Sequence, residues 1–150
     1  MRLESLAALV GLAACGGAAP LDYSCADIAP QKLEQIWSVT FKAAGCSASG
    51  CHDPGSRQVT DGFTWQTEHD FWQKARSLQP REDSSKPYVT GGDLSRSYLY
   101  DKLTGPGQGS HVDQMPVGGP FFTSHQLALV KGWICSGAPE PPSNLQERPR

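Results

Sequence analysis

Apolar side chains recur every three to four residues in four stretches of the chain, the spacing that places them along one face of an α-helix. No stretch alternates apolar and polar residues one by one, as a half-buried β-strand does. The pattern therefore predicts a small all-α domain of about four helices. These lie at residues 26–44 and 67–78, then from a cap at Asp93 or Ser95 to Leu103, and from a cap at Thr123 or Ser124 to about Cys135.

Capping residues indicate where these helices begin and end. Asp27 precedes the first helix and Thr67 the second, and both residue types bond the free N–H groups of a first turn. Gly45 follows the first helix, where glycine is common. Phe41 and Trp133 are expected to pack the first helix against the last.

The segments between the helices are expected to be irregular. Residues 80–92 are mostly polar, and residues 104–120 are rich in glycine and proline, which interrupt regular structure. The whole chain has 16 glycines and 12 prolines among its 150 residues. This composition predicts one domain with long Gly/Pro-rich loops.

The first fifteen residues resemble a bacterial lipoprotein signal. A short start with Arg2 is followed by an apolar run at residues 6–14, which is too short to span a bilayer. Leu-Ala-Ala-Cys at residues 12–15 resembles a lipobox, in which Cys15 becomes the lipidated first residue. The alternative is an ordinary secretory signal cleaved nearby. Both interpretations export the chain, and Gly16 after the cysteine is typical of outer-membrane sorting.

The remaining boundaries follow from composition. Residues 1–15 are the predicted signal and residues 16–24 a tether; the domain itself occupies residues 25–139. Residues 140–150 form a polar, proline-rich tail that is expected to stay disordered. The net charge is −2 and no basic cluster stands out, which argues against a nucleic-acid partner.

The string Cys-Ser-Ala-Ser-Gly-Cys-His at residues 46–52 carries the clearest chemistry. Two cysteines followed directly by a histidine are typical of covalently attached haem: the thiols form thioethers and the imidazole binds the iron. The common spacing has two residues between the cysteines, and this chain has four. Met115, in the second loop, is a candidate for the other axial ligand. These residues predict one covalent haem c held by Cys46, Cys51, His52 and Met115.

Cysteine pairing depends on that prediction. Lipidation of Cys15 leaves four of the five cysteines for an oxidising compartment, where an even number is expected to be used. If Cys46 and Cys51 hold haem, Cys25 and Cys135 remain as a disulfide pair near the ends of the domain. The alternative is two disulfides and no haem, with Cys46–Cys51 closing a small local loop.

Other interpretations of the candidate ligands stay open. Met115 is also a plausible gap-filling core residue, and His52 a surface histidine. His111 lies four residues before Met115 and could replace it, whereas His69 and His125 are expected to be exposed. A zinc site built on the cysteine string is disfavoured in an exported chain that lacks a second clustered pair of cysteines. No phosphate-binding loop or serine nucleophile motif appears, so the sequence favours an electron carrier over a catalyst.

The order of motifs resembles a known family. C-x4-C-H is followed by S-Y-L-Y-D-K-L-T-G, then by M-P-V-G-G-P and finally by W-I-C-S-G-A-P. This order is similar to class I c-type cytochromes, above all to exported planctomycete and myxobacterial cytochrome-like domains. The resemblance covers residues 25–139.

The resemblance implies a cytochrome c-like fold around a single haem c. Cys46 and Cys51 would be the attachment residues, His52 the proximal ligand and Met115 the distal ligand. Electron transfer with a redox partner protein, at a membrane reached through the lipid on Cys15, is the function it implies. The alternative is a haem-free, disulfide-stapled structural or binding lipoprotein of the same fold.

Overall fold

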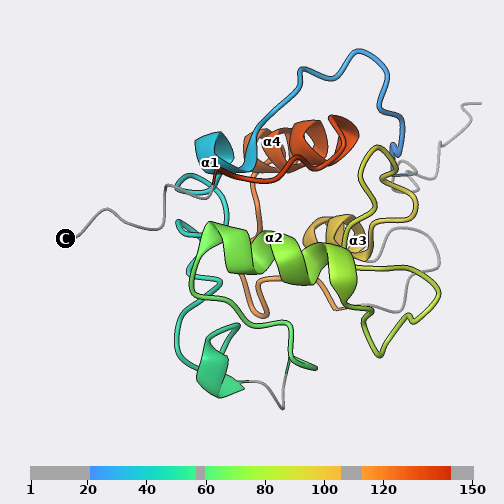
Figure 1. Ribbon diagram of the computed structural model, residues 1–150. Coiled ribbons are helices and arrows are strands. Elements are labelled where there is room, and N and C mark those ends of the chain that lie inside the picture. The colour runs from blue at the N-terminus through green and yellow to red at the C-terminus, as the bar shows by residue number, and fades with distance from the viewer. Residues whose placement is uncertain (1–20, 57–59, 106–112, 143–150) are drawn as a thin grey trace, which may run out of the picture.

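A computed structural model describes residues 21–56, 60–105 and 113–142. Within these ranges no β-strand forms, and Thr90 and Asp93 make an isolated bridge. None of the helices there is long and apolar enough to cross a membrane. The all-α prediction is confirmed. The elements are α1 (Leu33–Ile36), the 3-10 turn η1 (Pro54–Ser56), α2 (Glu68–Ser77), α3 (Tyr98–Thr104) and α4 (Ser124–Cys135) (Figure 1).

Two helices begin where the sequence predicts. The hydroxyl of Thr67 accepts a 3.1 Å hydrogen bond from the N–H of Asp70, which caps α2. Thr123 caps α4 by accepting from the N–H of Gln126 at 3.2 Å. The Gln126 side chain accepts in return from the N–H of Thr123 at 2.9 Å, completing a capping box.

The first predicted helix is wrong over most of its length. Only Leu33–Ile36 is α-helical, and Lys32 rather than Asp27 precedes it. Residues 37–50 form successive turns. Ser, Val, Thr and Phe, which follow Trp37 in the chain, all have lower helix propensity than Ala or Leu. The Thr40 hydroxyl also donates to the carbonyl of Ile36 at 2.7 Å, a local bond of the kind that competes with helix.

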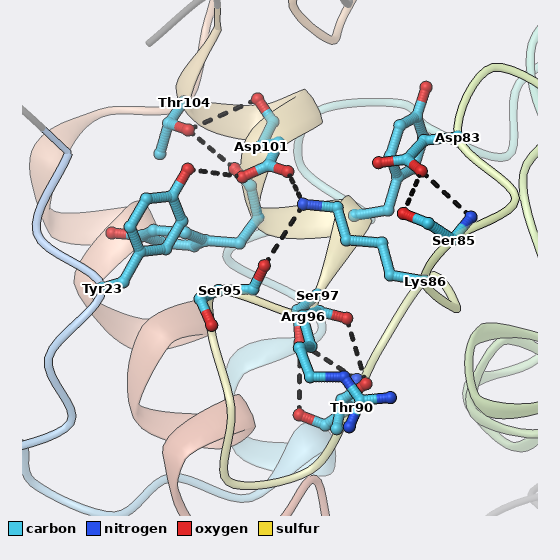
Figure 2. A network of polar contacts seen from close by, with 12 residues as sticks. Tyr23, Asp83, Ser85, Lys86, Thr90, Ser95, Arg96, Ser97, Asp101 and Thr104 are labelled. Carbon is cyan, nitrogen blue, oxygen red and sulfur yellow. Dashed lines mark hydrogen bonds and ion pairs between the residues drawn. The ribbon is translucent and has the colours of Figure 1, made fainter. Parts of the chain in front are cut away.

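The third helix begins later than predicted, at Tyr98. The carboxylate of Asp93 instead accepts from the Ser95 hydroxyl at 2.7 Å and from the Arg96 N–H at 3.1 Å, which stabilises a turn. The Ser97 hydroxyl accepts from the N–H of Thr90 at 3.0 Å, so both ends of this turn are tied together (Figure 2). Local polar bonds therefore delay the start of α3.

Helix α4 is the element against which α1 and α3 pack. Figure 1 shows α1 beside α4 at one end of the molecule. The expected contact between Phe41 and Trp133 runs through Phe71, whose ring centroid lies 4.6 Å from that of Phe41 and 5.9 Å from that of Trp133. Gly132 allows the chain before α1 to approach closely, since a Cβ there would lie 2.5 Å from the carbonyl oxygen of Ala29.

The predicted disulfide between Cys25 and Cys135 is present, with Cα atoms 5.4 Å apart. It joins the segment before α1 to the end of α4. Two further contacts hold the same segment. The Tyr23 hydroxyl donates to the Asp101 carboxylate at 2.8 Å, beside the Lys86–Asp101 ion pair (Figure 2). Lys131 pairs with Asp22 at 2.7 Å. Residues 22–25, which the sequence places at the junction of tether and domain, are therefore fastened to the domain.

Candidate functional site

The residues singled out as haem ligands line a cavity of about 330 Å³. Cys46, Cys51 and His52 enter its wall from the turns after α1, and Met115 enters from the loop after α3. Aromatic and aliphatic side chains form much of the rest, and several polar residues join them. Among the other lining residues are Phe41, Phe63, Trp65, Tyr88, Tyr98, Leu99, Leu103, Asp61, Arg81, Glu82 and Lys102.

The main chain folds the cysteine string into a closed loop. The N–H of His52 donates to the carbonyl of Cys46 at 2.9 Å, so the histidine turns back over the first cysteine. Gly50 has φ +83°, a conformation that glycine adopts without strain. Its N–H donates to the Asp53 carboxylate at 3.1 Å. Cys51 lies in the chain between Gly50 and His52, so the hydrogen bonds of these two neighbours hold its main chain in place.

The imidazole of His52 is held from several sides. Its Nδ1 lies 2.6 Å from the carbonyl oxygen of Phe63, so Nδ1 carries the hydrogen and donates it. Its ring stacks on Trp65, with centroids 4.5 Å apart and planes 18° apart. Burial lowers the pKa of His52. In the neutral ring the Nε2 nitrogen therefore keeps a free lone pair. Metal-binding histidines characteristically donate the N–H of their other ring nitrogen to such a carbonyl.

Met115 is partly buried and packs against the core at the cavity wall. Its N–H donates to the carbonyl of Lys102 at 2.7 Å. The neighbouring Gln114 donates through its side-chain amide to the carbonyl of Leu103 at 3.0 Å. These two bonds fasten the loop to the last turn of α3, and the chain thereby brings Met115 to the same cavity as His52.

The two thiols of the string differ in exposure. Cys46 is partly buried, and burial, followed by the neighbouring Cys51, raises the pKa of its thiol to about 12. Cys51 is exposed. Both are free thiols, and the structure contains no Cys46–Cys51 disulfide.

The donor atoms do not converge as zinc ligands do. Over the described ranges, no three side chains of His, Cys, Asp or Glu are placed to hold a single metal ion. A tetrahedral site would require thiolates and imidazole about 2.0–2.3 Å from one point. Thioether attachment has a different requirement, because the cysteines bind the edge of a macrocycle while the histidine faces its centre.

The cavity wall also contains polar side chains that sequence reasoning missed. Lys102 is largely buried, pairs with Glu82 at 2.7 Å and lies 5.7 Å from the centre of the Tyr98 ring. The Tyr98 hydroxyl also donates to Glu82. The indole N–H of Trp65 is buried and finds no acceptor among the described residues. No spacing in the sequence connects these residues to the cysteine string, so only the fold could reveal them.

The remaining sequence candidates lie elsewhere. His125 is exposed, as expected. His69, also expected to be exposed, is instead half-buried, and its Nε2 lies 3.0 Å from the Glu140 carboxylate. His111 and the predicted lipidation site Cys15 lie outside the described residues.

No family model, curated protein or solved structure matches this chain. The functional interpretation therefore depends on the residues and geometry described above.

Proposed function

We propose that this chain is an exported c-type cytochrome domain that holds one haem covalently and transfers electrons. One observation carries the proposal. Two thiols, an imidazole and a thioether line a single cavity, although His52 and Met115 are 63 positions apart (115 − 52) in the sequence. A loop fastened to α3 brings the methionine to that wall.

The residues present fit a haem. The cavity volume of about 330 Å³ lies at the lower end of the range of about 300–1,000 Å³ that small-molecule sites occupy, so the fit depends on the lining residues. Its aromatic and aliphatic lining suits a flat, apolar macrocycle. The unpartnered N–H of Trp65 is a buried donor that a polar group of a ligand could satisfy. Neutral imidazole and thioether sulfur are both established ligands of haem iron.

Each residue then has a defined role. The thiols of Cys46 and Cys51 would each add across a vinyl group of the haem, the sulfur bonding one vinyl carbon and the thiol hydrogen passing to the other. His52 Nε2 and the Met115 sulfur would bind the iron. Bound haem supplies reversible one-electron chemistry. The Phe63 carbonyl fixes the tautomer of His52, because it accepts the Nδ1 hydrogen at 2.6 Å. Phe63 and Trp65 pack against the partly buried imidazole of His52 and limit the access of water to it.

The proposal includes a location and a kind of partner. Lipidation of Cys15 would anchor the exported domain to a membrane, where a redox protein would exchange electrons with it. Cys15→Ser is expected to release the protein from the membrane fraction or to block its processing. An unchanged soluble location for both forms would contradict the anchor.

The test is covalent haem binding in cells that coexpress a c-type maturation system. The purified protein should show a Soret band, and its haem stain should survive denaturing electrophoresis. Cys46→Ser combined with Cys51→Ser should abolish the covalent stain. Cys25→Ser combined with Cys135→Ser is the matched control and should keep it, because that pair lies outside the cavity lining. A wild-type protein without the Soret band or stain would contradict the proposal.

The second candidate is a haem-free lipoprotein of the same fold with a structural or binding role. The four-residue spacing between Cys46 and Cys51 favours it, because covalent haem sites commonly have two residues there. In that case the oxidising compartment reached on export would take two electrons and two protons from the thiols and leave a local disulfide.

A further inference from the structure

Trp65 contacts His52 through both its main chain and its side chain. Its main-chain N–H donates to the carbonyl of His52 at 2.9 Å. Its indole stacks on the imidazole face, with ring centroids 4.5 Å apart. Phe63, two residues earlier, accepts the Nδ1 hydrogen. One short segment therefore holds the main chain, the ring edge and the ring face of His52.

The stack itself is close to parallel, with 18° between the ring planes. Most other aromatic contacts in this core are tilted or edge-on, as between Phe63 and Trp65 with planes 59° apart. A parallel indole restricts rotation of the imidazole about its side-chain bonds. It also presents the electron-rich face of the ring system to the imidazole.

The other groups near His52 do not supply the same interaction. Lys102 is a cation that lines the same cavity, so it offers the imidazole no electron-rich face. The Phe63 ring meets the imidazole edge-on, at 77°. Trp65 is thus the aromatic face that lies flat against His52 among the described residues.

We propose that Trp65 is a positioning residue that fixes the ring plane of His52 and stabilises the oxidised state of the bound haem. This inference rests on the proposed function. An imidazole bound to ferric iron carries more positive charge than one bound to ferrous iron. Attraction between that charge and an indole face within about 6 Å therefore favours the ferric form. Weakening the interaction should raise the reduction potential.

Fluorinated tryptophan incorporated at position 65 alone tests the electrostatic part without changing packing. Each added fluorine withdraws electron density from the indole face while its shape is nearly preserved. The reduction potential of the haem protein should rise stepwise from tryptophan to monofluoro- and difluorotryptophan. The same residues placed at position 72 are the matched control, because Trp72 faces His69 at 5.9 Å and does not line the cavity.

Trp65→Leu tests the positioning part. The electron paramagnetic resonance signals of the ferric protein should shift, since they respond to the orientation of the axial imidazole, while mass spectrometry should still find the haem attached. If this variant does not fold, Trp65→Met serves, because a flexible methionine fills much of the same space without presenting a flat ring to His52.

An unchanged potential across the fluorinated series, with haem present, would overturn the inference and leave the proposed function standing. Unshifted resonance signals in the position-65 variants would do the same for the positioning role. A wild-type protein that takes up no haem would overturn both proposals.

Discussion

The main-chain N–H of Met115 donates a 2.7 Å hydrogen bond to the carbonyl oxygen of Lys102, at the end of α3. This bond fixes the point at which the glycine- and proline-rich loop meets the helix. Because Lys102 also lines the cavity, the bond places the methionine at the same wall. A residue from an irregular loop thereby gains a defined position.

Met115→Ala should remove the sixth ligand of the haem protein. We expect loss of the weak near-infrared band of sulfur-to-iron ligation and a large fall in the reduction potential, because methionine sulfur favours reduced iron. The thioethers should remain. Val117→Ala is the control, since Val117 is 75% exposed at the cavity rim. A spectrum unaltered in the Met115 variant would point to His111 or to an open coordination position.

Replacing Cys25 and Cys135 together by serine should destabilise the domain and leave its haem attached. The bridge joins residues 110 positions apart, and closing such a loop stabilises by about 4–5 kcal/mol in the chain-entropy model. Urea unfolding of the oxidised protein and the variant measures the difference. A free energy of unfolding equal to that of the oxidised wild-type protein would contradict the stabilising role of the bridge.

Gly132→Ala should destabilise the domain, although alanine favours a helix by about 1 kcal/mol over glycine. The new Cβ would lie 2.5 Å from the main-chain oxygen of Ala29, which cannot move without shifting the segment before α1. We expect the free energy of unfolding to fall by about 1–3 kcal/mol, which is typical of overpacking, when it is measured by urea unfolding.

Ala128→Gly, at an exposed position of the same helix, is the control. It should lower the free energy of unfolding only by the difference in helix propensity between alanine and glycine, about 1 kcal/mol. A Gly132→Ala protein more stable than wild type would show that the two segments do not approach so closely.

Glu82 should make stability depend on acid pH. The hydrogen bond from Lys102, followed by that from Tyr98, lowers the pKa of Glu82 below its usual 4.5. Because the folded-state pKa is lower, the contribution is fully present above the unfolded pKa and is lost as pH falls through the folded value. Glu82→Gln should flatten this decline in urea unfolding measured from pH 7 down to about pH 3.

The effect should be about 1 kcal/mol or less, because the Glu82 side chain is 57% exposed. Asp27→Asn is the control, since the exposed Asp27 side chain makes no hydrogen bond or ion pair with other residues of the described ranges. An acid dependence that is the same in wild type and the Glu82 variant would contradict this account of the pair.

The sequence predicts a helix correctly where the capping residue and the spacing of apolar residues indicate the same start. Thr67 and Thr123 bond the first turns of α2 and α4, so hydrophobic spacing and capping chemistry predict the same start. The stretch after Ile36 has helical apolar spacing without helical propensity, and the structure forms turns there. Asp93 is a good capping residue, yet it stabilises a turn before α3, because the sequence does not show which nearby N–H groups a carboxylate will reach.

In the candidate site, too, some residues can be recognised from the sequence and others only from the fold. The cysteine string and Met115 were recognisable because each residue type has a specific chemistry. Trp65 has no such signal, since a buried tryptophan is ordinary in any core. Its role follows only from the parallel stack on His52, which depends on how residues 52–65 fold back on themselves.

The most direct test of the central claim is the mass of the tryptic peptide that spans residues 43–57, which contains Cys46, Cys51 and His52. The peptide should come from protein matured with a c-type cytochrome assembly system and be measured under denaturing conditions. The account predicts a peptide that carries the mass of one haem. A peptide that has lost two hydrogens and carries no haem would identify a Cys46–Cys51 disulfide and contradict the account.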